Sequence, residues 1–156
     1  MPIPEFILAT RRKIGHDLLW LPGVTAVVFD DVSRVLLGRR SDDGRWTTIG
    51  GIPEPGEQPA VCAVREVLEE TGVTATVERL VSVRAGEPMS YPNGDRAQFL
   101  DLTFRCRYVS GEAHVADDES LEVGWFGPAE LPDLDDVCHR RIEEARTTDG
   151  PPSFVV

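Results

Sequence analysis

Apolar runs and polar turns alternate along the chain in a pattern typical of short strands separated by a few helices. Five runs rich in apolar and β-branched residues predict strands, at positions 24–29, 35–38, 73–83, 98–109 and 121–126. The polar residues 30–33 between the first two runs predict a β-hairpin. Residues 46–49 lead into Gly50 and Gly51, and the proline-containing segment that follows predicts a loop.

Helical spacing marks both ends of the chain. Residues 10–20 predict a short helix that ends before Pro22. Three residues form its expected buried stripe: Ile14, Leu18 and Leu19. Residues 135–146 predict a C-terminal helix. Residues 149–156 contain two consecutive prolines and predict a tail that is mobile or packed on a neighbour.

A third helix is predicted in the middle of the chain. Pro59 suits its first position, and Gly72 suits the position just past its end. Three apolar residues at helical spacing form its expected core-facing stripe: Val61, Val64 and Leu68. Three glutamates fall on a different side, so we expect one apolar face and one acidic face.

Strands interleaved with two or three helices indicate an α/β layered domain. A chain of 156 residues suggests one domain over residues 1–156, with an N-terminal helical extension at 1–22 and the tail at 149–156. The hydrophobic share of 41% and the charged share of 28% are ordinary for a globular protein. No apolar run reaches membrane-spanning length, and the N-terminus lacks the apolar core of a signal peptide.

Charge and cysteine usage narrow the partners and the compartment. The net charge of −11 should repel nucleic-acid polymers and anionic membranes, and also a small phosphorylated substrate unless metal ions screen it. Cys62, Cys106 and Cys138 are odd in number and lack metal-ligand spacing, which favours reduced thiols and a cytoplasmic location. Three scattered histidines are interpreted as surface residues: His16, His114 and His139.

The central helix carries the candidate chemistry. Glu66, Glu69 and Glu70 are three and four residues apart near its C-terminal end, where like-charge repulsion and the helix dipole both disfavour them. A divalent cation would compensate, and Mg²⁺ prefers oxygen ligands. Arg65 lies one turn before Glu69 and could orient it by a forked hydrogen bond. The cluster favours metal-assisted hydrolysis of a diphosphate, with a carboxylate as general base.

Residues 51–73 resemble the Nudix box at every specified position: Gly-x5-Glu-x7-Arg-Glu-U-x-Glu-Glu-x-Gly-U, where U is aliphatic. The resemblance implies the Nudix fold, a mixed β-sheet sandwiched between α-helices. It also implies a Mg²⁺-dependent hydrolase, with Mn²⁺ as a substitute ion, acting on a small nucleotide. A homodimer is left open.

Carried over residue by residue, the resemblance assigns metal binding to four positions: Gly50, through its backbone carbonyl, Glu66, Glu69 and Glu70. Glu57 and Arg65 match the remaining charged positions of the box, and Glu70 is also a candidate catalytic residue. Some family members use another glutamate from a loop before a late strand as base or ligand. Glu119 is the first candidate here and Glu122 the second, against the alternative of a merely solvated acidic loop.

Specificity signals after the box point in two directions. Pro88 matches a position typical of the family's ADP-ribose hydrolases, and Tyr91 matches one typical of dinucleoside polyphosphate hydrolases. Tyr91 could stack on a base and Arg96 could contact a phosphate, unless residues 91–96 are only a hairpin turn. Arg39 and its neighbour Arg40 could face phosphates or form an exposed basic pair, and Trp46 fits a core position better than a base platform.

The sequence therefore favours, narrowly, cleavage of ADP-ribose or a nucleotide sugar. The alternative within the class is a pyrophosphohydrolase of nucleoside triphosphates, including oxidised ones. Two rivals come from other classes: a non-catalytic Nudix module that binds a nucleotide and regulates a partner, and an acidic helix that binds calcium structurally. Regulatory modules commonly lose box glutamates, and none is lost here.

Overall fold

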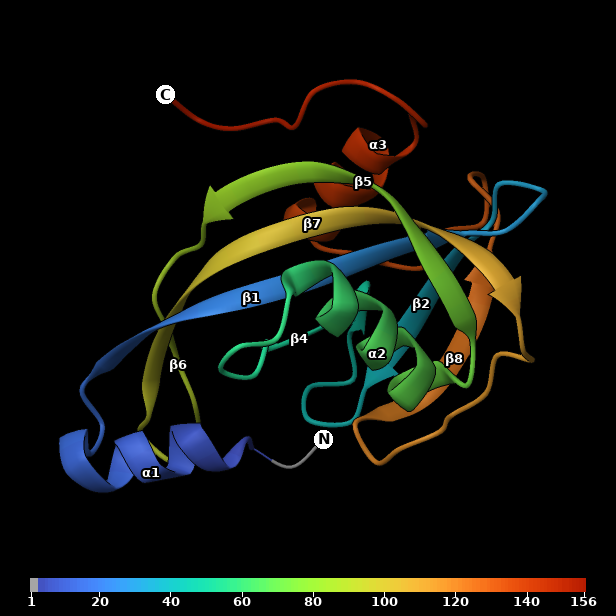
Figure 1. The fold of residues 1–156 in the computed structure, drawn as a ribbon. Helices are drawn as coiled ribbons and strands as arrows, with labels where there is room; N and C mark the ends of the chain where they lie inside the picture. The colour runs from blue at the N-terminus through green and yellow to red at the C-terminus, as the bar shows by residue number, and fades with distance from the viewer. Residues whose placement is uncertain (1–2) are drawn as a thin grey trace.

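A mixed β-sheet organises the computed structural model, which describes residues 3–156 (Figure 1). Its central strand, β1 (Leu18–Phe29), pairs in parallel with β7 (Arg96–Ser110) along its whole length. The main path runs β3-β2-β1-β7-β5. The remaining strands are β2 (Val35–Arg40), β3 (Trp46–Thr47), β4 (Ile49–Gly51), β5 (Thr74–Ala85), β6 (Met89–Ser90) and β8 (Ser120–Phe126). The five predicted strand runs are confirmed, and so is the hairpin between β1 and β2.

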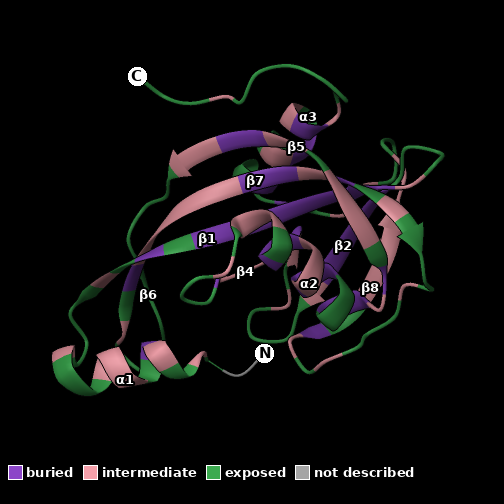
Figure 2. Cartoon of the chain, viewed as in Figure 1, coloured by how far each residue is buried: buried purple, intermediate pink, exposed green. Residues whose placement is uncertain are grey.

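Two helices cover the two faces of this sheet, α2 (Pro59–Thr71) and α3 (Asp136–Ala145) (Figure 1). Strand β1 shows why its sequence is apolar without alternation. Ala26 and Val28 pack in the core under α2, whereas Val27 and Phe29 pack in the core under α3. Because both of its faces are covered there, β1 is buried continuously from Gly23 to Phe29, whereas much of its first half is exposed (Figure 2). The predicted α/β class and the layered sandwich are confirmed.

Helix α1 (Glu5–Ile14) lies apart from both layers, beside β6 and the start of β1 (Figure 1). The prediction of a helix over residues 10–20 is therefore wrong in its second half. Residues from Leu18 onward are extended, because Leu18 pairs with Arg96 of β7 and the pairing continues through Pro22. Leu18 is exposed rather than part of a buried stripe. The predicted helical extension consequently ends at Ile14, not at residue 22.

The C-terminal tail packs on the chain's own sheet. The Ser153 amide donates to the Val81 carbonyl at 2.8 Å, and Ser153 forms a β-bridge with Ser82. The Arg84 guanidinium donates to the Ser153 hydroxyl at 2.7 Å. The tail was predicted to be mobile or packed on a neighbour. At Ser153 it instead pairs through its backbone with the edge strand β5.

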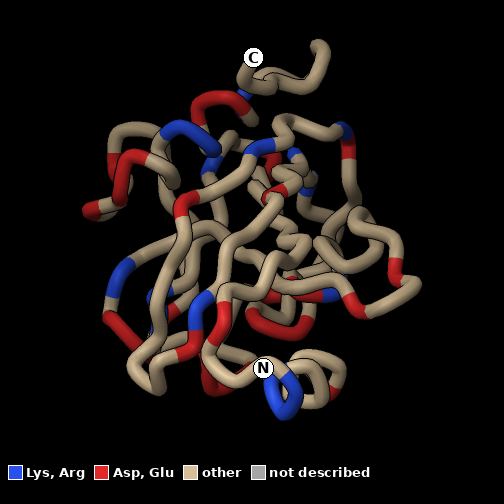
Figure 3. Tube along the Cα trace, turned by 90° about the vertical axis from the view of Figure 1, so that its left-hand side faces the viewer, with Lys and Arg blue, Asp and Glu red and all other residues tan. Residues whose placement is uncertain are grey.

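Asp and Glu positions lie at many separate places along the chain trace (Figure 3). The 27 acidic residues outnumber the 16 basic ones. Many of the basic residues are paired, as in the Arg34–Asp30 and Arg105–Glu78 contacts at 2.7 Å each. Among the described residues, no helix is long and apolar enough to cross a membrane.

Candidate active site

Helix α2 begins and ends where the sequence predicts. Pro59 occupies its first turn, and Gly72 closes it with a left-handed φ of 70°. The Gly72 amide donates to the Leu68 carbonyl at 3.0 Å. Gln58 precedes the helix without a capping hydrogen bond from its side chain, so the start depends on proline geometry rather than on a polar cap.

The face that α2 turns toward the sheet is the acidic one. Its buried residues are Cys62, Ala63, Glu66, Val67, Glu70 and Thr71. Val61 and Leu68 are exposed at 55% and 51%, so the predicted core stripe is wrong. The error has a physical cause, because the pattern treats glutamates as solvent-facing. Here Glu66 is 0% exposed and Glu70 7%.

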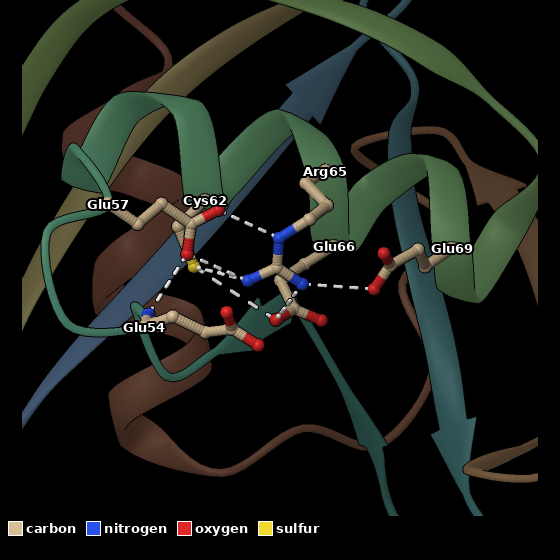
Figure 4. Close-up of polar contacts among 6 residues, drawn as sticks. All are labelled: Glu54, Glu57, Cys62, Arg65, Glu66 and Glu69. Atoms are coloured by element: carbon tan, nitrogen blue, oxygen red, sulfur yellow. Dashed lines mark hydrogen bonds and ion pairs between the residues drawn. The ribbon is translucent and has the colours of Figure 1, made fainter. Parts of the chain in front are cut away.

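Arg65 links the glutamates of this segment (Figure 4). Its Nε and Nη2 donate to the two carboxylate oxygens of Glu57 at 2.8 and 2.9 Å, a forked pair. Its Nη1 donates to Glu66 Oε1 at 2.9 Å and to Glu69 Oε2 at 3.0 Å. The expected contact between Arg65 and Glu69 is present, but the fork goes to Glu57. One guanidinium thus restrains carboxylates from the loop and from two sides of the helix.

The surroundings of these carboxylates shift their pKa values in opposite directions. The forked hydrogen bond with Arg65 lowers the pKa of Glu57 to about 2. Desolvation raises the pKa of Glu66 to about 7, although Arg65 opposes this shift. Desolvation, with the charges of Glu66 and Asp117, raises the pKa of Glu70 to about 8, while Arg40 opposes it. Two glutamates are therefore held where their charged forms are costly without a cation.

Gly51, the first residue of the box, is needed for close packing against Glu66. A Cβ atom at this position would lie 2.3 Å from both Cδ and Oε1 of Glu66. Any other residue would push the carboxylate out of its place. The first glycine of the pattern and its second glutamate, far apart in sequence, are therefore one spatial unit.

The donor set fits a divalent cation. Glu66 Oε2 is buried and has no hydrogen-bond partner, and Glu70 is buried beside it on the same face. Glu69 instead lies on the flank, with its side chain 47% exposed. Among the described residues, no three acidic, histidine or cysteine side chains lie close enough together as placed to hold a metal ion, so a third carboxylate ligand from Glu69 stays a prediction. Mg²⁺ commonly takes one or two carboxylates and completes its shell with water and substrate phosphates, so two inward glutamates suit it.

A cavity of about 520 Å³ adjoins this acidic site. Three of the predicted site residues line it, Gly50, Tyr91 and Glu119, together with Gly51. Glu122, the second candidate acid, points elsewhere and forms an ion pair with Arg39. The structure thus places Glu119 beside the glycines that precede α2, and places Arg39 away from the cavity.

The other predicted contacts are spread more widely. Arg40, rather than Arg39, is close enough to shift the pKa values of Glu70 and Tyr91, and it also binds Asp42. Arg96 is exposed and does not line the cavity. Pro88 is exposed in the loop before β6. Trp46 packs on the core edge-to-face with Phe126, at 4.9 Å between ring centroids, as expected. The three histidines are exposed, and the three cysteines are buried and free, both as expected.

Several cavity residues were not predicted from the sequence. They come from α1, from the loop after β4 and from β7: Ile7, Leu8, Arg11, Ile52 and Phe99. A signal for the first three existed in the apolar residues at positions 3, 7 and 8, which have helical spacing from Ile3 onward. Placing the helix at residues 10–20 hid that signal.

Comparisons with known proteins agree on one family. A model of the NUDIX domain matches residues 19–145. A MutT-like protein of Streptomyces ambofaciens is 35% identical over 129 residues, which cover 82% of this chain and 78% of that protein. A putative 8-oxo-dGTP diphosphatase of Bacillus subtilis (strain 168) is 30% identical over 114 residues, 73% of this chain and 71% of its own length. The crystal structure of a MutT NUDIX hydrolase from Burkholderia pseudomallei superposes with a TM-score of 0.64 at 26% identity, covering 81% of this chain and 98% of that one.

Proposed function

The chain belongs to the Nudix hydrolase family and is a pyrophosphohydrolase of that type, and from this premise we propose that it splits nucleoside diphosphates linked to a second moiety. ADP-ribose or a nucleotide sugar is the preferred substrate. Water attacks one phosphorus, the bridging P–O bond breaks, and two phosphate monoesters leave. Mg²⁺ is the preferred ion, and Mn²⁺ can replace it.

One observation carries the proposal: the buried Glu66 packs against Gly51, which lines a cavity of the size that small ligands use, and Glu70 is buried on the same face of α2. The cavity of about 520 Å³ lies within the usual range for ligand sites. Glu66 and Glu70 carry carboxylates whose burial disfavours their charged forms. Ionising buried carboxylates is unfavourable for folding. Their presence near a ligand cavity is therefore better explained by cation and phosphate binding than by fold stability.

Each charged residue of the site takes a part in this proposal. Glu66, Glu70 and the Gly50 carbonyl would hold the cation, which when bound neutralises charge on the phosphoryl oxygens. Arg65, fixed by Glu57, keeps Glu66 and Glu69 in position. Glu119 lines the cavity and takes the proton of the attacking water as general base. Tyr91 offers its ring at the rim of the cavity.

A second candidate is a nucleoside triphosphate pyrophosphohydrolase. Its support is the relative from Bacillus subtilis whose name describes a putative 8-oxo-dGTP diphosphatase. The two candidates leave different products. A diphosphate diester yields two monophosphates, whereas a triphosphate yields a monophosphate and inorganic pyrophosphate.

A product assay separates them. ADP-ribose, a nucleotide sugar, dGTP and 8-oxo-dGTP would each be incubated with the full chain in Mg²⁺, in Ca²⁺ or in chelator. Added phosphomonoesterase reports new monoesters, and added pyrophosphatase reports pyrophosphate. We expect monoester release from ADP-ribose or the nucleotide sugar in Mg²⁺ only. Faster pyrophosphate release from the triphosphates would favour the second candidate, and turnover in chelator would contradict the role of the glutamates.

A further inference from the structure

One wall of the cavity comes from residues that precede the span matched by the NUDIX domain model. Helix α1 contributes Ile7, Leu8 and Arg11, which precede residues 19–145, the span matched by the domain model. Ile7 is buried, and Leu8 is partly exposed along the cavity. Leu21 of β1 and Phe99 of β7 also line the cavity. The cavity is therefore closed in part by a segment that precedes the span matched by the domain model.

We propose that this cavity binds the aromatic base of the nucleotide, and that Ile7 and Leu8 of α1 form the wall that selects it; this rests on the hydrolase function proposed above. The same cavity is lined by Gly51, which touches Glu66, and by Glu119. A base held against α1 would therefore direct its diphosphate toward the buried glutamates.

The apolar lining favours an aromatic ring over a sugar. A base can stack on the ring of a phenylalanine and pack against the aliphatic side chains of isoleucine and leucine. Sugar hydroxyls buried against them would lose hydrogen bonds to water without replacement. The polar side chains of the nearby loop already bind one another: Asp95 accepts from Asn93 at 3.0 Å and contacts His16 at 2.8 Å.

Arg11 positions this wall rather than contacting the reacting atoms. Its Nη1 donates to the carbonyls of Gly15 and Asp17 at 3.2 and 2.6 Å, and its Nη2 donates to the Arg96 carbonyl at 2.6 Å. These bonds tie the end of α1 to the start of β7. The side chain is only 12% exposed, so the guanidinium is held in a fixed place. The wall is consequently attached to the sheet and not a loose arm.

Adenosine binding to the full chain in chelator tests the subsite without catalysis. Calorimetric titration should give binding by the parent, and ribose should not compete. Leu8→Trp fills the cavity and should weaken binding at least about tenfold, and Leu8→Ala should weaken it about threefold through lost apolar contact. Leu8 is 39% exposed, so both variants should fold. Lys13→Trp places the same ring on an exposed position of α1 outside the lining and should bind as the parent does.

Kinetics with the best nucleotide substrate supply a second readout. Leu8→Trp should raise KM with kcat nearly unchanged, because the base contact is the same in the ground state and the transition state. Absence of adenosine binding by the parent, or equal affinity in Leu8→Trp and Lys13→Trp, would overturn the subsite. Either result together with nucleotide cleavage by the parent would leave the hydrolase proposal standing. Failure of the hydrolase itself is read separately, as no product from any nucleotide in Mg²⁺.

Discussion

Helices α2 and α3 cover opposite faces of one sheet, and they are built differently. Helix α3 starts with a polar cap, in which Asp135 accepts from the Cys138 amide at 2.8 Å, and it buries Cys138, Ile142 and Ala145. Helix α2 has no side-chain cap and buries two glutamates, one with an unpaired oxygen. The α3 layer follows the rules for stability at each of these points. The α2 layer breaks them at the residues to which chemistry is assigned.

The cost of the α2 layer is electrostatic and local. Apolar neighbours of Glu66 and Glu70, including Cys62 and Val67, pack in the core as tightly as those under α3. What differs is the pair of buried carboxylates: Arg65 donates to Glu66, yet desolvation still raises the pKa values of Glu66 and Glu70. A helix face that carries the candidate catalytic residues can therefore keep ordinary packing, while two buried ionisable groups carry the electrostatic cost.

The largest effect is expected from breaking the α3 layer. Ile142→Ala should lower the free energy of unfolding by about 2–5 kcal/mol, since it removes a fully buried side chain from the core. Turnover per folded molecule should stay at the parent value. Chemical denaturation measures the first quantity and phosphate release the second. Val137→Ala, on the exposed side of α3, is the control and should cost little. A large loss of turnover in folded Ile142→Ala would contradict the division between an α3 layer that stabilises the fold and an α2 layer that carries the chemistry.

The opposite result is expected on α2. Glu70→Gln should reduce turnover by a factor of about 10² or more, because it removes a charged group that acts in the transition state. The protein should stay folded, and its melting temperature in chelator should not fall, since one buried like charge disappears. Glu143→Gln on the surface of α3 is the matched control. Activity within about threefold of the parent would remove Glu70 from the site.

Stability without metal should fall as pH rises. The pKa values of Glu66 and Glu70 are raised from 4.5 to about 7 and about 8 in the folded chain. Between pH 4.5 and 8 the unfolded chain has lost these protons while the folded chain still binds them. Folding in this range therefore requires proton uptake, and it becomes less favourable as the pH rises. Melting curves in chelator should show this decline, and the Glu66→Gln, Glu70→Gln double variant should flatten it. Saturating Mg²⁺ should offset the decline in the parent by binding the native state. Equal slopes in parent and double variant would contradict the assignment.

Glu119 precedes β8 and Glu122 lies within it, and variants of the two identify which acid belongs to the active site. Glu119→Ala should lower kcat mainly, because the side chain lines the cavity and a base acts on the chemical step. Glu122→Ala should change little, since it removes only a surface ion pair with Arg39, worth about 0–1 kcal/mol. Steady-state kinetics on the best substrate compare them. A silent Glu119→Ala beside a severe Glu122→Ala would move the base to the other residue.

The smallest effect is expected at Arg96. The sequence suggests a phosphate contact, which would make Arg96→Ala raise KM. The structure uses the backbone carbonyl of this residue, which accepts from Arg11, and leaves its side chain exposed outside the cavity. We therefore expect both kinetic constants to stay within about twofold of the parent, as for other exposed side chains. A KM increase with unchanged kcat would instead support a contact between Arg96 and a substrate phosphate, which would place the start of β7 in the substrate site.

Local signals predicted most of the fold. The strand runs, the hairpin at residues 30–33 and the limits of α2 and α3 follow from β-branched runs, a polar turn and the Pro59–Gly72 pair. The N-terminal helix was misplaced because Leu18, Leu19 and Trp20 suit a helix or a strand equally well. Only pairing with β7, remote in sequence, makes them extended.

The family and the segment that carries the box follow from residues 51–73 alone, because the spacing of glycine, arginine and glutamates is a local property of the chain. The side of α2 that faces inward depends instead on contacts with residues remote in sequence. Hydrophobicity favoured Val61 and Leu68, whereas the contacts of Glu66 with Gly51 and Arg65 belong to the opposite side. The tertiary structure also brings α1 to the cavity, where Arg11 donates a hydrogen bond to a carbonyl 85 residues away. Periodicity in a sequence carries no information about such partners, since burial of a charged side chain depends on what the rest of the chain places around it.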